Sequence, residues 1–475
     1  MNAVPANPSF AGSLPATKAR VPKGDWQLSF WKVALFIAAH MALALAMKQA
    51  PILATVHGWS LLFFGLYLAL SGRSRDQVVT VAAYIVGAEV LWRMTGARVF
   101  WEMGKYSISL IFIASMLRQH RAPKGRAALY LLLMSPSLLV TFSLESLESA
   151  RNYISYNFSG PAALGVCWMF FKDFKITRPQ LFRMMLAMLA PAVGIAALTL
   201  LGIATTEVKF GRNSNLEASG GFGPNQVSSA MGLGILAAFI CFMDDRTRRR
   251  LKPLFMVLML AMAAQTALTF SRTGLYLGIV SSCVAAVFLV RNRRALGTIL
   301  IGGTVIVVLA WLVILPRLNE LTGGRLEDRL KNTSSTGRDV VMMEDIHIFL
   351  RFPALGTGPG RAREYRDKFM AGIAAHTEYT RMLAEHGILG LLALVVMGIE
   401  VMAAWTRARG AWNKALVSAF FAFALLFMLA TGMRLAAPCF MFGLAAGLCL
   451  VDGPRLRRII PAPGSQPLLQ APVTA

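Results

Sequence analysis

Charged side chains are scarce in this chain. Asp, Glu, Lys and Arg make up 15% of its 475 residues, whereas soluble domains carry about 25%. Hydrophobic residues reach 56%, and they gather in blocks of roughly 17–20 residues, the length that crosses a hydrocarbon core of about 30 Å. The composition therefore excludes an ordinary soluble enzyme. It predicts an all-α polytopic membrane protein with about 12–14 transmembrane helices.

The blocks give the domain organisation, with boundaries uncertain by about 2–4 residues. We place them at 30–47, 54–70, 78–94, 99–117, 127–143, 153–171, 181–203, 225–243, 253–270, 273–290, 297–315, 387–404, 415–432 and 435–451. The predicted order is a cytoplasmic tail (1–29), transmembrane helices 1–11 (30–315), a long loop (316–386), C-terminal transmembrane helices (387–451) and a second cytoplasmic tail (452–475). The first tail is polar and proline-containing, so we expect it not to be a signal peptide.

Cysteines are few, and none lies in the long loop. The chain has five of them, with no CxxC pair and no zinc-like spacing: Cys167, Cys241, Cys283, Cys439 and Cys449. This pattern excludes a disulfide framework and a structural zinc site. We interpret all five as small apolar residues of membrane helices.

Acidic motifs for metal binding and glycine motifs for nucleotides are also missing. No acidic pair lies between Lys48 and His57 on the first predicted outer loop, and Asp244 and Asp245 fall on the predicted cytoplasmic side. Neither a GxGxxG nor a Walker A sequence is present. We therefore expect no metal and no cofactor.

Positive charge, in contrast, is abundant. The formal net charge is +25, and the Lys and Arg residues collect in alternate loops between the blocks. Such alternation marks cytoplasmic loops, so we predict a bacterial inner-membrane protein with both termini in the cytoplasm. The charge lies in short loops and not on one face of a domain. It therefore favours membrane lipid headgroups as partners and argues against nucleic acid.

The long loop is the predicted functional segment, because polar insertions of this length are usually functional. We expect residues 319–336 to be irregular and residues 337–350 to form an amphipathic helix. A GTGPG turn follows at 356–360, and residues 375–386 are predicted as a second short helix. The chain shows no internal repeat, which argues against a transporter built from repeats.

Two glycine-containing motifs precede the long loop on the predicted outer face. GFGPN (221–225) ends a loop that carries Arg212, and it opens a helix whose free N–H groups favour an anion. Asn225 is a candidate substrate-binding residue there. Arg272, in SRTG (271–274), is placed at the outer mouth of the bundle, where an ionisable side chain usually faces a cavity or a partner. The alternatives are a solvated arginine in an ordinary loop and an interfacial arginine whose head reaches water.

The loop itself supplies the remaining candidates. Arg338 and His376 lie at the starts of its two predicted helices, and Glu378 and Tyr379 follow closely. Histidine suits general-base chemistry near neutral pH, and Glu378 or Tyr379 could orient it or contact a sugar. A structural histidine at a helix start is the alternative.

These motifs resemble the O-antigen ligase and Wzy-type polymerase superfamily. The resembling segments, in the family's order, are GFGPNQVSSAMGLG (221–234), FSRTGLYLG (270–278), GRDVVMMEDIHIFLRFPALGTGPG (337–360) and AHTEYTRMLAEHGILGLL (375–392). The resemblance implies a GT-C-like helical bundle with a periplasmic loop over a cavity. It places Arg212 and Arg272 on the donor diphosphate and His376 on the acceptor hydroxyl. Thr377 stands where the family often has asparagine.

The resemblance implies a glycosyltransferase that moves a glycan from undecaprenyl diphosphate to a glycan or glycolipid acceptor. Two arginines in a low-dielectric mouth would stabilise the charge of the leaving group, so we expect a metal-independent, inverting reaction. Polymerisation of repeat units is the first candidate. Ligation onto lipid A–core or onto protein is the second, and a lipid-linked oligosaccharide flippase or transporter is the alternative of another class.

Overall fold

The computed structural model describes residues 29–120, 125–211, 213–244, 247–331, 337–366 and 375–451. Both predicted tails, apart from Ser29, lie outside the described residues. Most of the described residues are helical, which confirms the predicted all-α class. In its first part the helices are α1 (Phe30–Gln49), α2 (Pro51–Leu70), α3 (Arg75–Met94), α4 (Met103–Arg118), α5 (Arg126–Met134), α6 (Ser137–Leu144), α7 (Leu147–Asn157), α8 (Ser159–Phe171) and α9 (Arg178–Thr205).

The second part continues in the same way. Its helices are α10 (Pro224–Met243), α11 (Lys252–Leu268), α12 (Thr273–Leu289), α13 (Arg293–Leu309), α14 (Leu315–Leu321), α15 (Arg325–Lys331), α16 (Arg338–Arg351), α17 (Glu378–Arg407), α18 (Ala411–Thr431) and α19 (Ala436–Gly447). Two short strands, β1 (Phe174–Thr177) and β2 (Leu448–Val451), complete the fold.

Helices long and apolar enough to cross a membrane confirm the polytopic class. Within the described ranges there are ten of them, and three further apolar helices are shorter. Every predicted apolar block overlaps a helix. The block at 127–143 is interrupted between α5 and α6 at Pro136, because proline lacks an N–H group and disrupts the helix ladder. The last block leaves the helical state after Gly447 and continues as β2.

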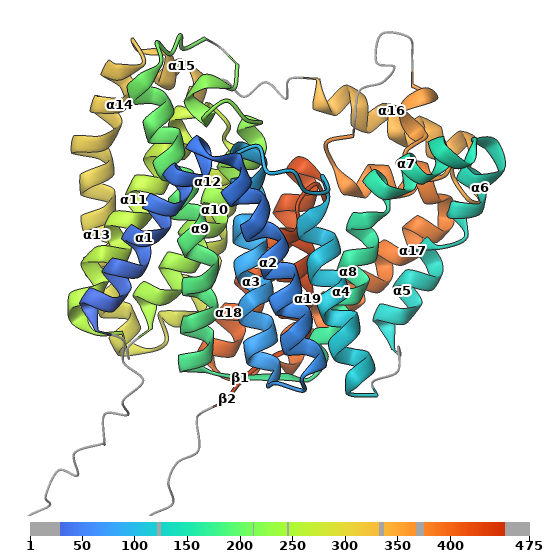
Figure 1. The fold of residues 1–475 in the computed structure, drawn as a ribbon, viewed down its shortest axis with the longest axis horizontal. Helices are drawn as coiled ribbons and strands as arrows, with labels where there is room; N and C mark the ends of the chain where they lie inside the picture. The colour runs from blue at the N-terminus through green and yellow to red at the C-terminus, as the bar shows by residue number, and fades with distance from the viewer. Residues whose placement is uncertain are drawn as a thin grey trace, which may run out of the picture.

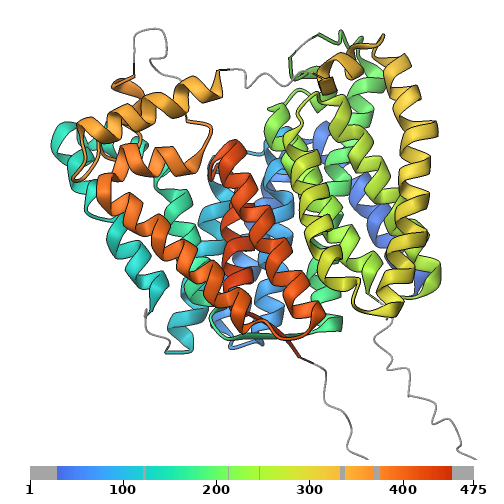
Figure 2. The ribbon, with the colours of Figure 1, turned by 180° about the vertical axis from the view of Figure 1, so that it is seen from behind.

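The helices form a central group between two flanking groups (Figure 1). Helices α2, α3, α4, α8, α18 and α19 lie in the middle, α1 and α9–α14 lie on one side, and α5–α7, α16 and α17 lie on the other. The view from behind shows the same division (Figure 2). Helices α7, α15 and α16 lie at one end of the bundle, here called the α16 end. The strands β1 and β2 lie at the opposite end, here called the strand end.

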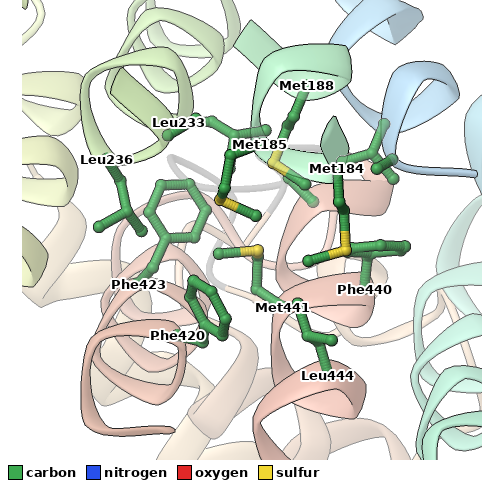
Figure 3. Packing of buried hydrophobic residues seen from close by; sticks show 14 of the residues in the cluster. Met184, Met185, Met188, Leu233, Leu236, Phe420, Phe423, Phe440, Met441 and Leu444 are labelled. Carbon is green, nitrogen blue, oxygen red and sulfur yellow. The ribbon is translucent and has the colours of Figure 1, made fainter. Parts of the chain in front are cut away.

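The apolar core joins the central group to α9 and α10. Figure 3 shows the packing of Met184, Met185, Met188, Leu233, Leu236, Phe420, Phe423, Phe440, Met441 and Leu444, all of them buried. The unbranched methionines of α9 adapt to the irregular space between the aromatic rings. In a membrane this close packing, and not exclusion from water, holds helices together.

Helices α10 and α12 approach each other at glycines. A Cβ atom on Gly274 would lie 1.9 Å from the carbonyl oxygen of Ser228, and one on Gly232 would lie 2.5 Å from that of Gly274. The N–H of Gly274 also donates to Ser228 Oγ at 2.9 Å. The SRTG and GFGPN motifs are therefore packed directly against each other.

The long loop is more ordered at its start than its sequence predicts. Residues 319–331 were expected to be irregular, and this is wrong, because they form the end of α14 and all of α15. Residues 332–336 lie outside the described residues. The predicted helix at 337–350 is confirmed as α16, and the predicted helix at 375–386 is confirmed as the first part of α17.

Candidate functional site

The GTGPG turn caps a break in α17. Gly387 has a φ of 60° and a ψ of −141°, which ends the first helical segment of α17 after His386. The N–H groups of Thr357 and Gly358 donate to the carbonyl oxygens of Ala384 and Glu385, each at 3.0 Å. Carbonyls at a helix end otherwise lack partners, so the turn satisfies them. Its role is to fix the short helix that begins just after His376.

His376 lies two residues before α17 and is half-buried. Burial, and then the positive charges of Arg434, Arg338 and Arg366, lower its pKa to about 4. Its Nδ1 atom is buried and has no hydrogen-bond partner within the described part of the chain. The imidazole is therefore neutral at pH 7 and can accept a proton or a hydrogen bond.

Arginines lie near this histidine and near one another. The charges of Arg338 and Arg434 act on His376, and those of Arg272 and Arg329 act on Arg338. We call Arg272, Arg329, Arg338 and Arg434 the arginine cluster. Burial lowers the pKa of Arg338, and the charges of Arg272 and Arg329 lower it as well. Burial and then Arg272 do the same to the pKa of Arg329. Because like charges repel measurably only when they are close, these shifts show that the 271–274 motif and the long loop converge.

Backbone carbonyls, not carboxylates, hold three members of the cluster. Arg329 Nε donates to the carbonyl of Phe270 at 3.0 Å, Arg338 to that of Ala430 at 3.3 Å, and Arg434 to that of Ala375 at 3.1 Å. Among the residues that the structure describes, none of these three arginines forms an ion pair. Burial and the charges of Arg381 and Arg338 lower the pKa of Arg434, while Glu378 opposes them. These three arginines thus keep a positive charge suited to an anion.

A polar pocket of about 620 Å³ adjoins the cluster, and Arg434 belongs to both. We call it the α16-end pocket. It is lined by Arg93, Trp101, Glu102, Ser149, Asn152, Tyr153, Tyr156, Asn157, Gln226, Gly360, Arg363, Arg366, Ala375, Glu378, Arg381, Glu385, Thr431, Gly432, Met433 and Arg434. Its volume is in the range of ordinary small-molecule sites.

The segment between α18 and α19 forms one wall of the pocket, and charged side chains of α4 and α17 hold it in place. The N–H of Met433 donates to Glu378 at 3.0 Å, and its carbonyl accepts from Lys105 at 3.1 Å. Glu378 and Glu385 both pair with Arg381. These contacts join α4, α17 and the α18–α19 connection, so Arg434 is carried on a rigid support.

Helix α7 lines the other side with amide and aromatic side chains. Asn152, Tyr153, Tyr156 and Asn157 come from it, and Trp101 lies opposite. The Tyr153 hydroxyl donates to Glu364, and this bond is the main cause of a raised Tyr153 pKa. Amides and hydroxyls can bond sugar hydroxyls, and aromatic rings can pack on their C–H faces. The lining therefore fits a carbohydrate.

The structure brings together three of the predicted site residues, Arg272, Arg338 and His376. Glu378 lines the pocket, but its carboxylate is engaged by Arg381 and the N–H of Met433. Arg212 lies outside the described residues.

Two other candidates lie elsewhere. Asn225 Oδ1 accepts a hydrogen bond of 2.7 Å from the hydroxyl of Ser271, which ties the two glycine motifs together. The hydroxyl of Tyr379 donates to the carbonyl of Leu425 at 3.0 Å. Neither residue is among those that line the pocket.

Sequence reasoning missed Arg329, Arg434 and the α7 side chains. Arg434 could have been predicted as a site residue, because it is a lone charge between two apolar blocks on the predicted outer face, as Arg272 is. The α7 side chains that line the pocket could not have been predicted in this way. Tyr153 and Asn157 fall at the edge of an apolar block, where such residues are common at the membrane–water interface.

The fold and the site together define a multi-pass helical membrane protein with an arginine-lined polar pocket at one end. Residues 257–395 match the O-antigen ligase family, and this confirms the predicted resemblance to the superfamily of O-antigen ligases and polymerases. The matched segment contains Arg272, Arg329, Arg338 and His376 and stops before Arg434. No curated protein sequence matches the chain.

Proposed function

We propose that this protein transfers a glycan from undecaprenyl diphosphate to a sugar hydroxyl at the α16-end pocket. The observation that carries the proposal is the convergence of the arginine cluster on a neutral histidine beside a pocket suited to sugars. The O-antigen ligase match, which covers Arg272, Arg329, Arg338 and His376, supports it.

The arginine cluster is the proposed site for the donor diphosphate. Guanidinium groups form paired, charge-assisted hydrogen bonds with phosphate oxygens. Within the described residues, Arg329, Arg338 and Arg434 donate hydrogen bonds to carbonyl oxygens, so their charge stays available. One buried nitrogen of Arg329, Nη1, has no partner within the described residues. A diphosphate would supply the missing acceptors, and we propose Arg212 as a further contact.

The proposed reaction is a single displacement. The acceptor hydroxyl oxygen attacks the anomeric carbon, and the bond from that carbon to the diphosphate oxygen breaks. The hydroxyl proton passes to His376, while the bonding electron pair leaves with undecaprenyl diphosphate. The arginine cluster stabilises the charge that develops on the leaving oxygen. Attack from the opposite face inverts the anomeric configuration.

Donor binding would also raise the pKa of His376. A pKa of about 4 is low for a general base at pH 7, because catalytic pKa values are most effective near the working pH. Part of the depression comes from neighbouring arginines. A bound diphosphate neutralises them and so raises the pKa of His376. The proposed base therefore gains strength only when the donor is in place.

The charge alternation supports one orientation of the molecule. Loops predicted to be cytoplasmic, such as those holding Lys172 and Arg409, lie at the strand end. We therefore propose that the strand end faces the cytoplasm and that the α16 end faces the periplasm of the inner membrane.

The test is transfer activity of the full-length protein in lipid nanodiscs, with an undecaprenyl-diphosphate glycan as donor. Arg272→Ala and His376→Ala should each reduce turnover at least about a hundredfold, the usual effect of removing a group that stabilises a transition state. Arg325→Ala is the matched control, because Arg325 is exposed on α15, one turn from Arg329. Full activity in either site variant, shown to be folded, would contradict the proposal.

The acceptor distinguishes two forms of the same reaction. Polymerisation remains the first candidate, and ligation is the second. Deleting the gene separates them. Single repeats on undecaprenyl diphosphate would identify a polymerase, whereas long chains retained on undecaprenyl diphosphate would identify a ligase. Donor glycans confined to the cytoplasmic leaflet would instead indicate the flippase alternative.

A further inference from the structure

A second cavity, also of about 620 Å³, lies at the strand end, opposite the α16-end pocket. We call it the strand-end cavity. Its charged lining residues are Arg126, Lys172, Lys175, Arg407, Arg409, Asp173 and Glu400. Five cations face two carboxylates, so the cavity is positive. It contains none of the residues of the proposed glycosyl-transfer site.

The acidic charge of the cavity is largely used within the protein. Glu400 pairs with Arg126 at 2.5 Å and with Arg407 at 2.6 Å. Lys172, Lys175 and Arg409 form no ion pair within the described residues. These three side chains are exposed, and they supply the net positive charge that a bound ligand would meet.

Secondary structure fixes the positions of these cations. Strands β1 and β2 pair in parallel, with Phe174 opposite Leu448 and Lys175 opposite Cys449. The side chain of Asn413 extends the sheet edge, since it donates to the Leu450 carbonyl at 3.2 Å and accepts from the Leu450 N–H at 2.7 Å. Lys175 therefore stands on β1, while Lys172 and Arg409 lie in the short connections that follow α8 and α17.

Apolar surface continues from the cavity along two helices. Helix α5 starts at Arg126, and Leu129 and Leu132 are exposed on its next turns. Helix α17 ends at Arg407, and Met402 and Ile399 are exposed on its preceding turns. At 1.5 Å per residue these side chains begin within about 5–12 Å of the cavity. A ligand with a charged head and apolar chains matches both surfaces.

We propose that the strand-end cavity binds the phosphate headgroup of an anionic phospholipid, whose acyl chains lie on the exposed faces of α5 and α17. Basic pockets between membrane helices attract such headgroups. The phosphate chemistry could also come from a soluble anion, but a soluble anion would make no use of the apolar faces of α5 and α17.

Native mass spectrometry of the full-length protein tests this. The detergent-solubilised protein is titrated with phosphatidylglycerol or cardiolipin, with phosphatidylcholine, and with inorganic pyrophosphate. The triple variant Lys172→Gln, Lys175→Gln and Arg409→Gln removes the unpaired cations of the cavity. The control triple, Arg291→Gln, Arg293→Gln and Arg294→Gln, removes the same charge from exposed arginines of the α12–α13 connection.

Anionic lipid should bind the wild type and the control equally, because the control arginines are not among the residues that line the cavity. It should bind the cavity variant about a hundredfold more weakly, since each basic side chain that meets the headgroup contributes about fivefold. Equal weakening of both triples, or equal binding of phosphatidylcholine, would overturn the proposal. Binding of pyrophosphate without anionic lipid would overturn the lipid assignment and leave a soluble phosphate ligand. Unfolding temperatures of both triples, measured without lipid, check that neither variant is misfolded.

Discussion

Arg434 donates a hydrogen bond of 3.1 Å to the carbonyl oxygen of Ala375, the residue directly before His376. The bond joins the α18–α19 connection to the start of the histidine-bearing segment, across 59 positions of sequence. Arg434 also lines the α16-end pocket. One guanidinium group therefore both supports the backbone at His376 and faces the space proposed for substrate.

Replacing Arg434 should reduce glycan transfer by about a hundredfold or more, since the variant loses a cation at the developing charge and a bond that positions His376. Arg434→Lys should recover part of the activity, because it keeps the charge but not the planar fork of donors. Turnover at saturating donor measures the effect. The control is Arg351→Ala, an exposed arginine on α16. Equal activity of Arg434→Ala and the control would contradict this role.

The sequence predicts the membrane helices and the outer arginines for clear physical reasons. An uninterrupted apolar block has few alternatives to a membrane helix, and a lone charge such as Arg272 is costly unless it serves a purpose. Contacts between residues that are distant in the sequence leave no such local pattern. The contact of Arg329 with the Phe270 carbonyl depends on the tertiary placement of α15, and α15 itself was expected to be irregular.

The GTGPG turn illustrates a different limit. Its three glycines do have positive φ values, 69° at Gly356, 85° at Gly358 and 84° at Gly360, as a glycine-rich turn predicts. The sequence places this turn in the predicted functional loop. The structure shows that its N–H groups are used by carbonyls of α17. The backbone conformation of the turn could therefore be predicted from the sequence, whereas its contact with α17 could not.

The pH dependence of the reaction should reflect the arginines around His376. The histidine is functional when neutral, so kcat/KM should fall only as the pH drops toward its pKa of about 4. In Arg338→Gln one of the depressing charges is absent, so the pKa rises and the acid limb of the profile moves to higher pH. Profiles of kcat/KM from about pH 3.5 to 8 measure this. Arg325→Gln serves as the control, and an unmoved limb in Arg338→Gln would refute the coupling.

The contact of α10 with α12 should depend on Gly274. A Cβ at this position would lie 1.9 Å from the carbonyl oxygen of Ser228, and backbone atoms cannot yield as a flexible side chain can. Gly274→Ala should therefore destabilise the protein by about 1–3 kcal/mol, as overpacking usually does, and should also disturb Arg272. Thermal unfolding in nanodiscs measures the loss. Gly303→Ala on α13 is the control, since nothing lies within 4 Å of its added Cβ. Similar unfolding temperatures for the two variants would argue against a close contact.

Gly358 should be essential for holding the start of α17. It needs its positive φ, and a Cβ there would lie 2.4 Å from Thr141 Oγ1 and 2.9 Å from the Thr141 N–H nitrogen. Gly358→Ala adds both backbone strain and a clash with α6, so the turn should move away from the carbonyls of Ala384 and Glu385.

Gly324→Ala separates the two effects, because Gly324 has a φ of 81° but open space around it. The control should lose only about 1 kcal/mol from strain, while Gly358→Ala should lose more and should also lower transfer through His376. Hydrogen exchange at residues 378–386 reports the displacement directly. If exchange there is equally slow in both variants, the turn does not support the short helix.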